Sequence, residues 1–96
     1  MFWRRKPTET ERLTEEAVAF AAERLETIQL HGSDFVGWGD SKEIGGSSLR
    51  FDPSRFQPQL YLRGTAYNLT RAQAERLHNA IRRRALRQAA AKETNQ

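Results

Sequence analysis

The feature that most constrains the fold is a pair of helix-start signals, because they divide the chain into two helices and a middle segment. In the first, Thr8 is followed three residues later by Glu11, the spacing at which the two side chains cap each other's backbone N–H groups. Apolar residues then recur at helical spacing: Leu13, Ala17, Phe20, Ala21 and Ile28. Gly32 suits the left-handed position just beyond a helix. We therefore predict a helix over residues 8–31, after an arm at residues 1–7.

The second signal opens a C-terminal helix. Thr70 and Gln73 repeat the capping spacing, which again satisfies N–H groups of a first turn. The core-facing line that follows has helical spacing: Ala74, Leu77, Ile81 and Ala85. We predict a helix over residues 70–91 and a polar tail at residues 92–96.

The middle segment, residues 32–69, has the composition of strands joined by turns. Five of the six glycines lie between Gly32 and Gly46, which favours turns and loops there. Alternating or β-prone runs predict three strands, at residues 34–38, 48–51 and 59–64, with an extension of the third to Tyr67 left open. We therefore predict one α+β domain of order α-β-β-β-α, in which both helices pack on one face of a three-stranded antiparallel meander.

Charge is unevenly distributed along the chain. Residues 1–48 hold six basic and nine acidic residues, a net charge of −3, whereas residues 49–96 hold ten and three, a net charge of +7. A basic half attracts polyanions or acidic proteins. At 100° per residue, three arginines of the second helix form one stripe roughly opposite its predicted core line. This arginine stripe consists of Arg76, Arg83 and Arg87.

Three interpretations of the arginine stripe remain open. Its spacing suits contacts with backbone phosphates, or with an acidic protein. The third interpretation is an ordinary helix face whose arginines are solvated or form weak ion pairs with acidic residues of the first helix. A seven-residue repeat on that helix supplies the candidate acids: Glu9, Glu16 and Glu23.

Two other segments are candidates for contact with a partner. The N-terminal arm interleaves aromatic and cationic residues, a pattern typical of anchors and base-stacking surfaces: Trp3, Arg4, Arg5 and Lys6. The glycine-rich loop places Trp38 between two glycines and brings Lys42 close behind it, and interaction residues often lie on such loops. The alternatives are that the aromatics of the arm pack on the sheet and that Trp38 marks a strand end.

Few residues suit catalysis. The chain has no cysteine, which excludes disulfides, thiolate metal ligands and a cysteine nucleophile. Asp40 and Lys42 have the Asp-x-Lys spacing of some metal-dependent nucleases, with Asp34 upstream, but a two-residue pattern is unspecific. The two histidines, His31 and His78, have no serine partner at a suggestive spacing. We therefore expect no enzymatic activity, no metal and no cofactor.

These observations favour a non-enzymatic interaction protein, a small accessory or inhibitor factor that binds a larger protein or ribonucleoprotein. Phage or mobile-element proteins that act on host machinery are examples of this class. The alternative is a sequence-nonspecific DNA- or RNA-binding protein that uses the arginine stripe and the basic arm. Double-stranded-RNA-binding domains share the element order, but their basic cluster opens the second helix, and here the arginines concentrate at its far end.

A second copy of the chain is a further candidate partner. Val18, Ala22 and Leu25 lie beyond the predicted core line of the first helix, so apolar surface would remain for a homodimer. The longest apolar run, residues 17–22, is far short of a membrane span, and the basic start of the chain lacks the apolar region of a secretory signal. We expect a cytoplasmic protein without membrane contact.

Overall fold

The computed structural model describes residues 6–30, 42–43, 48–54 and 56–94 of the chain. Within these residues the order of helices and strands is α1 (Glu9–Leu25), β1 (Lys42–Glu43), β2 (Leu49–Asp52), β3 (Gln59–Leu62), β4 (Thr65–Asn68) and α2 (Arg71–Thr94). The strands form an antiparallel sheet of order β1-β2-β3-β4 in the described part of the chain. Its three longer strands form an antiparallel meander, the predicted arrangement, but from other segments: β2 matches the predicted strand at 48–51, whereas β3 and β4 divide the third predicted strand and its extension. β1 adds a two-residue strand at one edge. The strand predicted at residues 34–38 lies outside the described residues.

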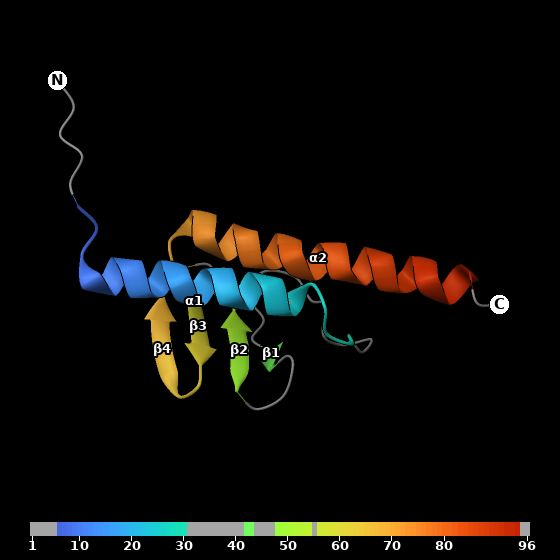
Figure 1. Ribbon diagram of the computed structural model, residues 1–96, viewed down its shortest axis with the longest axis horizontal. Helices are drawn as coiled ribbons and strands as arrows, with labels where there is room; N and C mark the ends of the chain where they lie inside the picture. The colour runs from blue at the N-terminus through green and yellow to red at the C-terminus, as the bar shows by residue number, and fades with distance from the viewer. Residues whose placement is uncertain (1–5, 31–41, 44–47, 55, 95–96) are drawn as a thin grey trace, which may run out of the picture.

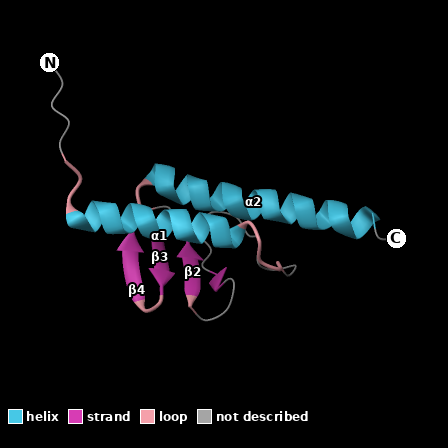
Figure 2. Cartoon of the chain, viewed as in Figure 1, coloured by secondary structure: helices cyan, strands magenta, loops and turns pink. Residues whose placement is uncertain are grey.

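The helices and the sheet form two layers, as predicted for an α+β domain with both helices on one face. Figure 1 shows α1 lying across the strands and α2 running alongside α1, and Figure 2 shows the same separation of helices from strands. The C-terminal end of α2 projects past the end of α1 (Figure 1). In the part of the chain that the structure describes, no helix combines the length and apolarity needed to cross a bilayer.

Both helices begin where the capping signals predict. The Thr8 hydroxyl accepts a hydrogen bond from the Glu11 N–H at 3.1 Å, and the Glu11 carboxylate accepts one from the Thr8 N–H at 3.0 Å. Thr70 and Gln73 make the same reciprocal pair at 3.1 and 2.9 Å. These bonds satisfy N–H groups that a helix start otherwise leaves unpaired.

The predicted helix ends are wrong in both cases. α1 ends at Leu25, not at residue 31, and α2 continues to Thr94, into the predicted tail. A longer α1 would need the Leu30 N–H to donate to the Glu26 carbonyl. Instead that N–H donates to the Gln88 side chain, and the carbonyl accepts from Arg87. Side chains of α2 therefore replace the helical hydrogen bonds of this segment.

The third predicted strand is in fact a hairpin. β3 and β4 pair across the turn at Arg63 and Gly64, which have φ values of +50° and +84°. Positive φ at both central residues is the geometry of the two-residue turns that match strand twist. The prediction of one continuous strand to residue 64 or beyond failed because arginine is an unusual residue in such a turn.

The hydrophobic core lies between the helix layer and the inner face of the sheet. The sheet contributes Leu49, Phe51 and Leu60, which alternate along β2 and β3. The helices contribute Val18, Ala21, Ala22, Leu25, Ala74, Leu77, Ala80 and Ile81.

The buried face of α1 differs from the predicted line. Val18, Ala22 and Leu25 are buried within the chain, so they are not available for the homodimer contact that the sequence suggested. Leu13 and Phe20, predicted to face the core, are 42% and 43% exposed. The face is rotated because α1 contacts the sheet on one side and α2 on another, which demands a broad apolar surface.

Candidate functional site

The arginine stripe of α2 faces α1. Arg76 Nη1 lies 3.0 Å from Glu15 Oε1, and Arg83 Nε lies 2.7 Å from Glu26 Oε1. Arg87 Nη1 is 3.9 Å from the same Glu26 oxygen. The guanidinium groups therefore have partners within the chain, although each side chain remains about half exposed.

The acidic partners differ from the predicted ones. Glu15 of α1 and Glu26, the residue directly after α1, face α2, whereas Glu9 and Glu16 pair with Arg12 along α1 itself. The stripe also lies closer to the core than the sequence indicated, because Ala80 is completely buried beside it.

Three side chains near the end of α2 hold the backbone that follows α1. Arg87 donates to the Glu26 carbonyl, and Arg84 donates to the Ile28 carbonyl. Gln88 makes two bonds to Leu30: its Nε2 donates to the carbonyl at 2.6 Å, and its Oε1 accepts from the N–H at 2.9 Å. We call Arg84, Arg87 and Gln88 the backbone clamp. The backbone clamp could not be predicted from the sequence, because nothing in the local pattern indicates which backbone groups these side chains contact.

The arginines of α2 favour the charged form of the Glu26 carboxylate. The hydrogen bond from Arg83 lowers the pKa of Glu26 below its ordinary value, and the charges of Arg83 and Arg87 act in the same direction against the effect of burial. On another flank of α2, burial lowers the pKa of His78, and the charge of Arg82 lowers it further.

The other predicted partner contacts are mostly outside the described residues. Trp3, Arg4, Arg5 and Trp38 lie there, as do Asp34, Asp40 and His31. Lys6 is exposed ahead of α1. Lys42 lies on β1, with its Cα opposite that of Phe51 on β2.

A connected cluster of side chains lies on the sheet face opposite the helices. The Arg50 guanidinium lies 4.1 Å from the centroid of the Tyr61 ring. The Tyr61 hydroxyl donates to Gln59 Oε1 at 2.6 Å, and Gln59 Nε2 donates to Asn68 Oδ1 at 2.7 Å. We call Arg50, Gln59, Tyr61 and Asn68 the outer-face cluster.

Strand register explains this cluster. Arg50 is opposite Tyr61, and Gln59 is opposite Asn68, so their side chains share a face. Alternation with the buried Leu60 puts Gln59 and Tyr61 on the outside. The same alternation in the sequence is a signal that could have identified these outward-facing residues.

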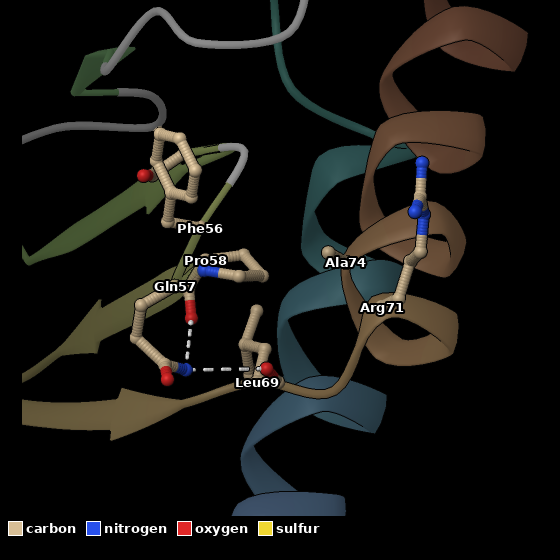
Figure 3. Close-up of a pocket in the computed structure, with 7 residues that line it drawn as sticks. Phe56, Gln57, Pro58, Leu69, Arg71 and Ala74 are labelled. Atoms are coloured by element: carbon tan, nitrogen blue, oxygen red, sulfur yellow. Dashed lines mark hydrogen bonds between the residues drawn. The ribbon is translucent and has the colours of Figure 1, made fainter.

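A small cavity lies at one end of the sheet, between the β2–β3 connection and the first turns of α2. It has a volume of about 260 Å³. Figure 3 shows Phe56, Pro58 and Leu69 on one side, and Arg71 and Ala74 of α2 on the other. Ser54 and Gln57 complete the lining.

Comparison with known proteins adds no relative. No family model matches the chain, and neither a curated protein nor a solved structure matches it.

Proposed function

We propose that this protein is a non-enzymatic protein-binding module whose main contact surface is the outer-face cluster. A small accessory or inhibitor factor would use such a surface to occupy part of a larger protein or ribonucleoprotein. The observation that carries the proposal is that four polar and aromatic side chains are connected to one another on a sheet face that no described helix covers.

The residue types of the cluster support this proposal. Tyrosine and arginine are enriched among the residues that dominate binding energy in protein interfaces. Here the Arg50 guanidinium lies over the ring of Tyr61, and the Tyr61 hydroxyl donates to Gln59 Oε1. Side chains that are already ordered lose less rotational entropy on binding.

Charge distinguishes this surface from a nucleic-acid platform. Of the four cluster residues only Arg50 is charged, so the cluster offers little of the phosphate neutralisation that dominates nucleic-acid affinity. The arginine stripe offers more cations, but Glu15 and Glu26 are paired with them. Binding through the outer face should therefore depend weakly on salt.

Site-specific photo-crosslinking tests the proposal directly. Ala66 is exposed and lies opposite Tyr61 in the β3–β4 register, so a benzoylphenylalanine at position 66 reports on the outer face. Ala19 is exposed on α1 and serves as the matched control position. In cells that naturally make the protein, we expect position 66 to yield one dominant protein adduct that position 19 does not yield.

Variants of the cluster complete the test. Tyr61→Ala should reduce the adduct yield, and on the purified complex it should weaken binding by about 2 kcal/mol, or about thirtyfold in Kd. Arg24→Ala removes an exposed arginine of α1 and should leave binding unchanged. Equal adducts from both positions would contradict the proposal. So would an adduct that nuclease removes, or tight, salt-sensitive binding of labelled DNA or RNA that is lost on Arg76→Ala.

A further inference from the structure

We propose that the cavity at the end of the sheet is a second binding site, which takes an acidic peptide segment of a partner protein. Its occupant is an aromatic or large aliphatic side chain that stands next to an aspartate or glutamate. The site is separate from the outer-face cluster, because the two share no residue. Either site can therefore fail without the other.

The size and lining of the cavity define the apolar part of this ligand. Its volume of about 260 Å³ is below the range of about 300–1,000 Å³ that is typical of sites for whole small molecules. It therefore suits one side chain. Of the seven described residues that line it, four are apolar: Phe56, Pro58, Leu69 and Ala74.

Phe56 gives a second reason to expect an apolar ligand. Its side chain is 92% exposed and lies at the edge of the cavity (Figure 3). Covering an exposed ring removes its apolar surface from water, which is favourable for binding. A partner side chain in the cavity would cover this ring.

The walls of the cavity are formed before any ligand binds. The Leu69 N–H donates to the Pro58 carbonyl at 2.9 Å, which joins the two connections that line the cavity. Gln57 Nε2 lies 3.4 Å from the Leu69 carbonyl and adds a weaker link between them (Figure 3). A site that is already shaped requires little reorganisation on binding.

Arg71 determines the charge of the ligand. Among the described residues that line the cavity it is the one with a charge, and its side chain is 91% exposed. Its Nε is 3.8 Å from Glu75 Oε1, which is a long contact for an exposed ion pair and therefore a weak one. A carboxylate next to the apolar anchor would complement Arg71 better, and a cation there would be repelled.

Three short peptides test both parts of the proposal by NMR. We would titrate the isotopically labelled protein with acetyl-Asp-Phe-Asp-amide, acetyl-Lys-Phe-Lys-amide and acetyl-Asp-Gly-Asp-amide at millimolar concentrations. The first should shift the amide signals of Gln57, Leu69, Arg71 and Ala74 in a saturable way. The other two, which lack the charge or the ring, should bind at least about tenfold more weakly.

Charge reversal provides the matched control. Arg71→Glu should make the lysine peptide the better ligand, and it should not unfold α2, because an acidic residue in the first turn of a helix is favourable. Arg82→Glu makes the same change at an exposed position of α2 outside the cavity and should leave the preference unchanged. Phe56→Ser should weaken every peptide that contains phenylalanine.

Three results would overturn the inference. They are shifts of equal size with all three peptides, shifts centred away from the cavity, and no shift at the lining residues at the highest peptide concentration. Because this measurement does not involve Tyr61 or Arg50, it leaves the proposed function of the outer face untouched.

Discussion

Removal of the Gln88 amide tests whether the backbone clamp stabilises the protein. In the folded chain this side chain forms both hydrogen bonds to the backbone of Leu30, at 2.6 and 2.9 Å. Leu30 is only 5% exposed, so water would replace these bonds poorly. Gln88→Ala deletes both bonds while keeping a residue of high helix propensity.

The expected loss follows from the two bonds. A hydrogen bond contributes about 1 kcal/mol net to stability, and a buried group left without a partner costs about 1–3 kcal/mol. We therefore expect Gln88→Ala to lower the free energy of unfolding by at least about 2 kcal/mol. Alanine is the better helix former by a few tenths of a kcal/mol, so helix propensity does not account for such a loss.

Urea denaturation measures the effect. With a slope of about 1–2 kcal/mol per molar urea, the midpoint should fall by about 1–2 M. Gln88→Glu keeps the shape and the acceptor but not the donor, so it should lose at least about 1 kcal/mol. Gln29→Ala, at an exposed position, is the control and should stay within about 0.5 kcal/mol of the wild type. If Gln88→Ala and Gln29→Ala have the same midpoint, the clamp does not stabilise the fold.

Three further predictions concern stability. Leu60→Ala, at a fully buried position, should lower the free energy of unfolding by about 2–5 kcal/mol in the same urea titration. Leu86→Ala, at a position that is 65% exposed, should leave that free energy within about 0.5 kcal/mol of the wild type. Gly64→Ala should lower the free energy of unfolding by about 1 kcal/mol, because the φ of +84° at this position is strained for alanine even though a Cβ would meet no atom within 4 Å. An unchanged melting temperature would contradict the hairpin geometry. Because Arg83 lowers the pKa of Glu26 in the folded state, the stability that this carboxylate contributes is present above its unfolded pKa. It is lost as pH falls through the folded value, so unfolding curves of Arg83→Ala should depend less on pH in the acid range than those of the wild type.

The parts of the fold that depend on local signals could be predicted from the sequence. Thr8 and Thr70 start their helices because a capping box needs only residues of the same turn. The end of α1 could not be predicted in this way. It depends on Gln88, which is 58 residues away from Leu30 in the chain. The hairpin at Arg63 was missed for a different reason, since its turn lacks the Asn-Gly or Asp-Gly pair that usually marks such a turn.

The residues of the outer-face cluster could be predicted only in part from the sequence. Alternation alone indicates that Arg50 and Tyr61 point away from a buried leucine and phenylalanine. What it does not indicate is the register that places Arg50 opposite Tyr61 and Gln59 opposite Asn68. A one-residue shift in pairing would have separated these side chains. The cavity depends on segments that are further apart in the chain, because Phe56 lies in the β2–β3 connection and Ala74 lies on α2.

The arginine-rich run from Ala80 to Arg87 divides between two roles that a helical wheel cannot separate. Its members Arg83, Arg84 and Arg87 contact α1 or the backbone that follows it, and arginine suits this role because its fork of N–H groups can serve a carboxylate and a carbonyl together. Arg82 lies on another flank of α2, exposed, and a helical wheel places it close to Arg71. That flank also carries Glu75, whose Oε1 is 3.8 Å from Arg71 Nε, so acids partly balance the arginines on this flank as they do along the stripe. Arg82 follows Arg71 by eleven residues, about 16 Å along the helix axis, so Arg71 rather than Arg82 supplies positive charge at the cavity.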